Sequence, residues 1–270
     1  MKVFSILSVF FLYGFLAEGI AYSVKAVACP DSFLITPCVC TLTGSQLDMT
    51  CAGLTTLKSL TDIFARAFPT NDMHSIVISG SQLGPLPNDV FNGKSFEIID
   101  FSNNRLTSFV NSGIFSSSQS RLTSLTVRQD TDDWTFNVAN VQSCNLLTEL
   151  ELSGYRMTLQ GTLSSTSLTS LTLRSDLQTS LPTLGALPAL SILNLDGSTI
   201  DNLVGNTFST LTKLAELYLG HNKIISLSTG LLSLTGPTTL VDLSSNLIEN
   251  MVQQAGWITG KYENFIWRNE

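Results

Sequence analysis

The chain has 270 residues, of which 43% are hydrophobic and 13% charged, and its formal net charge is −7. This length fits one or two compact domains or one elongated repeat domain. Nucleic-acid binding is disfavoured, because it needs clustered Lys and Arg side chains and the 14 basic residues are scattered.

The N-terminal segment has the pattern of a secretory signal. Lys2 is followed by an apolar run from Val3 to Leu16, and then by small residues such as Gly19 and Ala21. The run is short for a ~20-residue membrane span. We therefore predict a signal peptide over residues 1–21, with a boundary that extends to 28 at most, and a secreted mature protein that is not attached to a membrane.

Residues 22–72 are predicted to form an N-terminal cap. Four of the five cysteines lie in it (Cys29, Cys38, Cys40 and Cys51), which in an oxidising compartment indicates two disulfides. A zinc site is disfavoured, because no histidine lies in the cluster and the C-x-C spacing does not match the usual ligand pairs. Of three possible pairings, the one that joins Cys38 to Cys40 is disfavoured by its strained loop. The other two stay open.

The second half of the cap carries apolar residues at helical spacing: Leu57, Leu60, Ile63, Phe64 and Phe68. They predict a short amphipathic helix, with Thr61 or Ser59 as its N-cap and Pro69 as its stop.

The segment 73–252 is self-similar. The template L-x-x-L-x-L-x-x-N-x-L fits the stretch that ends at Ile224, with its asparagine at Asn222, and the stretch that ends at Leu106, with Asn104. Weaker copies place the asparagine position at Ser81, Asp130, Tyr155, Asp176, Ser198 and Asn246. Neighbouring positions are about 21 to 26 residues apart, within the period of ~20–29 that is typical of leucine-rich repeats.

The repeats predict an α/β solenoid, a leucine-rich-repeat horseshoe of about eight repeats with parallel strands on its concave face. In each copy the L-x-L pair is a short strand whose two apolar side chains enter the core. The asparagine hydrogen-bonds backbone groups where the chain leaves the strand. Serine and aspartate can replace it, whereas Tyr155 cannot, so the fourth repeat is expected to be irregular.

Other features of the repeats predict details of the core. Leu86-Pro87 and Leu181-Pro182 are predicted turns. Phe91, Phe115 and Phe208 follow the asparagine position by ten or eleven residues and are predicted to stack as an aromatic spine under the convex side. Cys144 is predicted to be a buried free thiol, with an intermolecular disulfide as the alternative.

The C-terminal tail, residues 253–270, places Trp257, Phe265 and Trp267 among polar residues. We interpret it as an atypical cap, with a truncated or alternatively spliced form as the alternative.

Side chains between and beside the strand leucines are expected to face the concave surface. The charged and aromatic ones are Arg128, Glu149, Glu151, Arg174, Asp196, Glu216, Tyr218 and Asp242. A mixed-charge band with a tyrosine is typical of a protein-binding face. We predict that these residues contact a protein partner, the alternative being a hydrated strand surface.

The sequence carries no catalytic motif. Its two histidines, His74 and His221, lie six repeat steps apart and are too distant to act together. The acidic run Asp130, Asp132 and Asp133 lacks the glycine and the distal glutamate of a calcium loop, so we interpret it as a solvated loop. We therefore expect a protein that is not an enzyme and has no cofactor and no metal.

Three stretches resemble a known group: Cys38-Val-Cys40-Thr-Leu-Thr-Gly, Leu47-Asp-Met-Thr-Cys51 and Ile63-Phe64-Ala-Arg-Ala-Phe68-Pro69. They resemble secreted arthropod leucine-rich-repeat proteins that are similar to the non-catalytic subunit of Oplophorus-luciferin 2-monooxygenase. The resemblance continues through the repeats, including the stretch from Leu86 to Phe91. The sequence departs from extracellular relatives that end in a cysteine-containing cap.

This resemblance implies the disulfides Cys29–Cys40 and Cys38–Cys51, and a secreted, non-catalytic partner subunit. It does not imply light emission. Two functions therefore compete: a binding or scaffold protein for a secreted partner, and a recognition protein for a microbial or glycan ligand. An extracellular-matrix role is a weaker third.

Overall fold

The computed structural model describes residues 27–66, 68–109, 111, 113–129, 133–176, 183–203, 207–227, 236–249 and 264–266. Several predictions fall on other residues: the signal peptide, the Leu181-Pro182 turn, Asp130 and Asp132, and the tail tryptophans Trp257 and Trp267.

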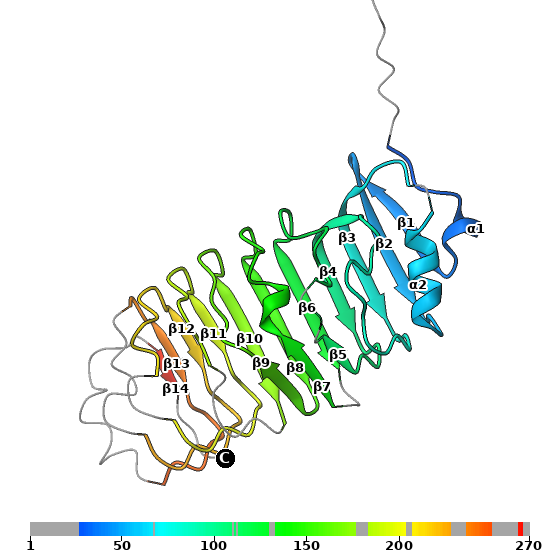
Figure 1. Cartoon of the computed structure of the whole chain (residues 1–270). Helices are drawn as coiled ribbons and strands as arrows, with labels where there is room; N and C mark the ends of the chain where they lie inside the picture. The colour runs from blue at the N-terminus through cyan, green and yellow to red at the C-terminus, as the bar shows by residue number, and fades with distance from the viewer. Residues whose placement is uncertain are drawn as a thin grey trace, which may run out of the picture.

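The chain forms a stack of turns, each of which adds one strand to a long sheet (Figure 1). The eleven strands follow the order β1-β2-β3-β4-β6-β8-β10-β11-β12-β13-β14. Every neighbouring pair is parallel except the β1–β2 hairpin. Strands β5, β7 and β9 form a second, parallel sheet. This is the predicted solenoid, and strands β3, β4, β6, β8, β10, β11, β12 and β13 are its eight predicted repeat strands.

The strands of the long sheet are β1 (Cys38–Thr43), β2 (Gln46–Ala52), β3 (Asp72–Ser79), β4 (Ser95–Ser102), β6 (Ser124–Gln129), β8 (Glu149–Gly154), β10 (Ser170–Ser175), β11 (Ile192–Asn194), β12 (Glu216–Tyr218), β13 (Leu240–Asp242) and β14 (Asn264–Ile266). Those of the second sheet are β5 (Ser108–Phe109), β7 (Trp134–Asn137) and β9 (Met157–Gln160).

Helices are few. The described residues contain α1 (Ser32–Ile35), α2 (Leu57–Phe64) and the 3-10 turn η1 (Val138–Asn140). Both α-helices belong to the cap, so the described return segments of the repeats are turns and short strands rather than the α-helices that an α/β solenoid implies.

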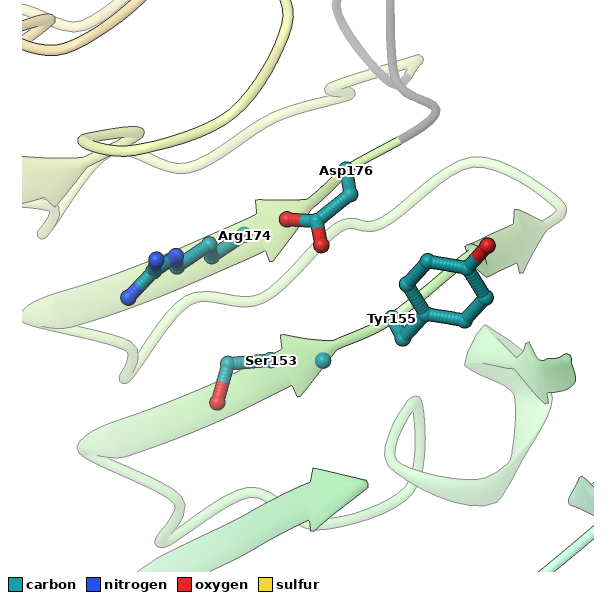
Figure 2. A pocket seen from close by; sticks show the side chains of 5 residues that line it. Ser153, Tyr155, Arg174 and Asp176 are labelled. Carbon is teal, nitrogen blue, oxygen red and sulfur yellow. The ribbon is translucent and has the colours of Figure 1, made fainter. Parts of the chain in front are cut away.

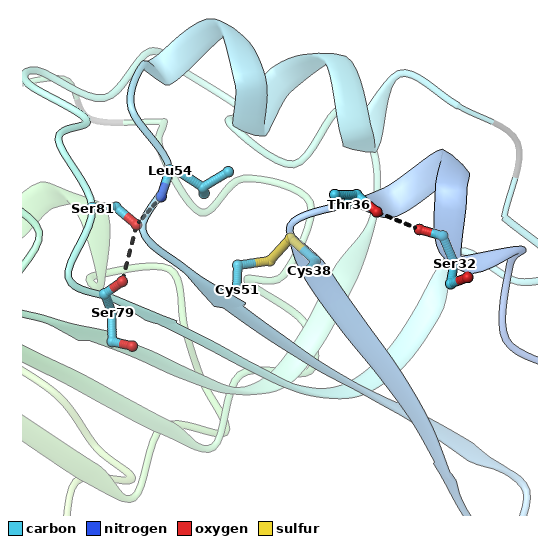
Figure 3. Close-up of a disulfide and its surroundings, with 7 residues drawn as sticks. All are labelled: Ser32, Thr36, Cys38, Cys51, Leu54, Ser79 and Ser81. Atoms are coloured by element: carbon cyan, nitrogen blue, oxygen red, sulfur yellow. Dashed lines mark hydrogen bonds between the residues drawn. A yellow bond between two sulfur atoms is a disulfide. The ribbon is translucent and has the colours of Figure 1, made fainter.

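The cap covers the first turn of the solenoid. It contains the disulfides Cys29–Cys40 and Cys38–Cys51, the pairing that the resemblance implies. Figure 3 shows the second of them beside the strand that leads to Leu54. The backbone N–H of Leu54 donates to the Ser81 hydroxyl at 3.0 Å, which ties the cap to the first repeat.

The predicted cap helix is present, but its N-cap was wrongly predicted. Thr56 caps α2, and its hydroxyl oxygen accepts from the backbone N–H of Ser59 at 3.2 Å. Ser59 therefore lies inside the first turn, and Thr61 lies further along and donates to the Lys58 carbonyl. The helix buries Leu60, Ile63 and Phe64 and ends before Pro69.

Asparagine ladders hold successive repeats together, as predicted. The Asn222 amide donates to the carbonyls of Leu195 and Gly220 at 2.9 Å, and its Oδ1 accepts from the backbone N–H of Ile200 at 3.1 Å. Asn246 repeats this pattern one turn later. Each side chain satisfies backbone groups that no strand pairing reaches.

In repeats three and five, the residue just before the predicted asparagine position is the buried polar one. The register aligns Gln129, Gly154 and Ser175 with one another and places Gln129 level with Asn103, one residue before Asn104. Gln129 and Ser175 are buried, and Oε1 of Gln129 accepts from two backbone N–H groups. Tyr155 and Asp176, one residue later, are exposed instead. Asp130 lies outside the described residues. The fourth repeat is thus irregular, as expected.

The aromatic spine was predicted only in part. Phe91 and Phe115 are buried and each packs against Phe101 rather than against the other. Phe208 is also buried but makes no ring contact within the described part of the chain. The aromatic core is instead concentrated in the N-terminal half, where it extends through Phe109 to Trp134.

Cys144 is buried and makes no disulfide, as predicted. Burial raises the pKa of its thiol to about 11. None of the helices in the described ranges has the length and apolar character needed to span a membrane.

Candidate interaction surface

One face of the long sheet points its side chains to solvent, and we call it the strand face. Its central column aligns one residue from each repeat strand: Val77, Asp100, Thr126, Glu151, Thr172, Asn194, Tyr218 and Asp242. Parallel pairing at ~4.8 Å spacing and alternation along each strand place these side chains on the same face. The leucines between them are buried.

The structure brings all eight predicted contact residues to this face. Glu151, Tyr218 and Asp242 belong to the central column, and Glu149 and Glu216 lie two residues before it. Three lie two residues after the central position of their strand: Arg128, Arg174 and Asp196. The eight therefore form one band over β6 to β13 and are not scattered over the solenoid.

Two of the predicted residues pair with each other. The Arg128 guanidinium donates to both carboxylate oxygens of Glu151 on the next strand, each at 2.6 Å. The pair is partly exposed, and its two parallel hydrogen bonds fix the guanidinium plane. The ion pair is therefore rigid and nearly neutral.

A second cluster surrounds Tyr218. Its hydroxyl donates to Oε2 of Glu216 at 2.8 Å. This hydrogen bond raises the pKa of Tyr218, and burial and the charges of Glu216 and Asp242 act in the same direction. Oδ1 of Asp242 accepts from the backbone N–H of Ser244 at 2.8 Å. The ring is therefore held in place within an acidic surrounding.

Arg174 stands between these two clusters. Its Nε donates to the Gly197 carbonyl of the next repeat at 3.0 Å. A Cβ at Gly197 would lie 2.9 Å from that nitrogen, so the glycine makes room for the arginine side chain. Arg174 is exposed.

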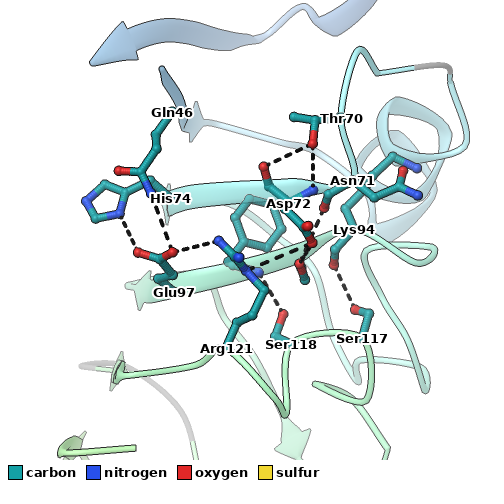
Figure 4. A network of polar contacts seen from close by, with 12 residues as sticks. Gln46, Thr70, Asn71, Asp72, His74, Lys94, Glu97, Ser117, Ser118 and Arg121 are labelled. Atoms are coloured by element: carbon teal, nitrogen blue, oxygen red, sulfur yellow. Dashed lines mark hydrogen bonds and ion pairs between the residues drawn. The ribbon is translucent and has the colours of Figure 1, made fainter. Parts of the chain in front are cut away.

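The sequence did not predict a polar network at the start of β3 and β4 (Figure 4). Glu97 accepts from His74 Nδ1 at 3.0 Å and from Arg121 at 2.6 Å. Ser95 donates to Asp72 at 2.7 Å in the same network. The spacing could have predicted this network, because the paired residues lie one repeat period apart in sequence. The repeat template, however, does not specify the residues at these positions.

This network contains one of the two histidines. His74 is on β3, and His221 follows β12, six strands away in the sheet order. At ~4.8 Å per strand the two are about 29 Å apart. Across the described ranges no group of three metal-ligating side chains comes together.

The fold defines the class of architecture: the chain has a leucine-rich-repeat fold. A solved structure, the crystal structure of the TLR13–ssRNA13 complex, aligns with 80% of this chain at a TM-score of 0.63 and 21% identity, and the match covers 30% of that protein's chain. At this identity the likeness concerns the fold alone.

In sequence the chain is similar to the Oplophorus-luciferin 2-monooxygenase non-catalytic subunit of Oplophorus gracilirostris. The two are 29% identical over 221 residues, which cover 80% of this chain and 61% of that subunit. The match thus spans less than two thirds of the relative's length. No protein-family model matches the chain.

Proposed function

We propose that this chain is a secreted, non-catalytic subunit that binds a protein partner through its strand face. The observation that carries this proposal is the similarity over 80% of the chain to a protein named as a non-catalytic subunit. Two disulfides in the cap support secretion, because such bonds persist in oxidising compartments.

The strand face is the part of the surface best suited to a partner. It is wide, regular and held rigid by the asparagine ladders, so little conformational entropy is lost on binding. Interface energy usually concentrates in a few aromatic and arginine anchors. Tyr218 and Arg174 are such anchors, because the first is fixed by Glu216 and the second by Gly197.

The charges of this face indicate the chemistry of the partner. Arg128 and Glu151 neutralise each other, whereas the other predicted contact residues of this face include four carboxylates, Glu149, Asp196, Glu216 and Asp242, and one cation, Arg174. Charge complementarity then favours a basic protein surface over the C-terminal strands.

Non-catalysis is part of the same proposal. A nucleophile, a base and an orienting group must lie within reach of one another. His74 lies far from His221 and pairs with Glu97. Both observations support a subunit that does not itself catalyse a reaction.

The immobilised full chain tests this proposal by capture from the secreted fluid of its source, with immobilised Tyr218→Ala as the matched control. We expect one enzyme to be retained by the parent chain and depleted on the variant, while the chain alone has none of that enzyme's activity. Retention of the same proteins by both, or activity of the isolated chain, would refute the proposal.

A second function, recognition of a glycan ligand, is favoured by one observation: an exposed tyrosine in a polar pocket next to the strand face.

A further inference from the structure

A polar pocket opens where β8 and β10 end (Figure 2). It has a volume of about 250 Å³ and is lined by Ser153, Gly154, Tyr155, Arg174 and Asp176. This is below the ~300–1,000 Å³ of pockets for drug-sized ligands, so the pocket suits one small ring.

The backbone explains why an aromatic ring is exposed there. Gly154 has a φ of 145°, and a Cβ on it would collide with the Gln129 carbonyl. Only glycine fits this close approach. The next backbone N–H, that of Tyr155, donates to the same carbonyl at 2.9 Å. Tyr155 therefore begins the turn after β8 with its ring pointing outward, and it remains 43% exposed.

The polar groups of the pocket are left available by their surroundings. Arg174 uses Nε on the Gly197 carbonyl, and its guanidinium end points away from Asp176 in Figure 2. The Asp176 carboxylate has no hydrogen-bond or ion-pair partner among the described residues. Other charges nearby are paired, such as Arg156 with Asp133 at 3.0 Å. The pocket thus presents an aromatic ring, a carboxylate and a guanidinium, with the carboxylate of Asp176 between the other two in Figure 2.

We propose that this pocket binds a single neutral pyranose ring, as a free sugar or as the end of a glycan. The C–H face of a pyranose packs on an aromatic ring whose polar edge stays solvated. Hydroxyls at different positions of the sugar ring can donate to a carboxylate and accept from a guanidinium, the groups that Asp176 and Arg174 supply. An anionic sugar is disfavoured, because its carboxylate would meet Asp176.

This inference rests on the second function proposed above and names its ligand class, and it shares only Arg174 with the proposed partner binding. The test is a titration of the full chain, followed by NMR, with methyl glycosides of glucose, mannose, galactose and N-acetylglucosamine, and with glucuronate as the anionic probe. We expect saturable binding of at least one neutral glycoside and none of glucuronate.

Variants assign the binding to the pocket. Tyr155→Ala should weaken the neutral glycoside about five- to tenfold, and Tyr155→Phe should retain it because the ring persists. Asp176→Asn should weaken it and admit glucuronate. The control is Phe33→Ala, which removes an exposed ring from the cap, outside the pocket, and should change nothing.

The proposal is overturned if no neutral glycoside binds at millimolar concentration, if glucuronate alone binds, or if Tyr155→Ala and Asp176→Asn both bind as the parent does. These titrations need no protein partner, so a failed capture experiment and a failed sugar titration remain distinguishable.

Discussion

At the scale of single residues, the asparagine ladder is the feature that sequence predicts best. The role of Asn104, Asn222 and Asn246 follows from chemistry alone, because one amide both donates and accepts where strand pairing stops. In repeats three and five the buried polar residue is instead the preceding one, Gln129 or Ser175. The template could not predict this, because it contains no polar residue at that position.

Asn222→Ala tests the ladder. The substitution leaves the Gly220 carbonyl and the Ile200 N–H buried without their partner. We expect a loss of about 1–3 kcal/mol in unfolding free energy, measured by urea denaturation. The exposed Asn145→Ala is the control and should change it by under ~0.5 kcal/mol. Equal midpoints for both variants would contradict the ladder.

Asp48 makes a pH dependence predictable. Burial raises its pKa, but hydrogen bonds from Ser75 and Thr43 and the charge of His74 outweigh this and lower it below the usual 3.8. A lowered pKa means stability that is present above the unfolded value and lost as the pH falls through the folded one. Asp48→Asn should therefore flatten the fall in melting temperature below about pH 4. If the melting temperature of Asp48→Asn falls below about pH 4 as steeply as that of the parent chain, Asp48 has no such role.

At the scale of elements, the cap shows what sequence can and cannot determine. The spacing of Leu57, Leu60, Ile63 and Phe64 predicts the helix correctly. The N-cap was predicted wrongly, because several threonines and serines occur in this stretch and only the packing of the helix face selects Thr56. The disulfide pairing likewise followed from the family resemblance, whereas spacing alone disfavoured one of the three pairings and left two open.

The cysteine assignment is tested by alkylation and mass spectrometry without reduction. In the unfolded, unreduced protein we expect one modified cysteine, Cys144. In the native protein it should react slowly at pH 8, because it is buried and its pKa is raised to about 11. Modification of a second cysteine after unfolding would contradict the two disulfides.

Substitutions of the leucines in the L-x-L pairs test the strand register. Leu195 and Leu219 are 1% and 0% exposed, so truncating either to Ala should cost ~2–5 kcal/mol from lost burial and the cavity together. Leu247→Ala, which removes a side chain that is 56% exposed, is the control. Unfolding midpoints of Leu195→Ala and Leu219→Ala that match this control would mean that the register is wrong.

At the scale of the whole molecule, repeat number and strand order follow from the period of the sequence, because each turn stacks only on its neighbours. The distribution of aromatic side chains in the core did not follow from this period. Phe91 and Phe115 contact each other only through Phe101 because β4 inserts a ring between them. The strand face was predicted residue by residue, but its pairings, such as Arg128 with Glu151, depend on cross-strand neighbours.

The most direct test of partner binding is a titration of the captured partner against the parent chain, Tyr218→Ala and Arg174→Ala, with the exposed Leu146→Ala as control. We predict that each strand-face variant loses ~2 kcal/mol or more, about thirtyfold in affinity, while its unfolding free energy changes by under ~0.5 kcal/mol. Parent-like binding by both strand-face variants, with binding abolished by a substitution in the cap or by Leu146→Ala, would contradict the account.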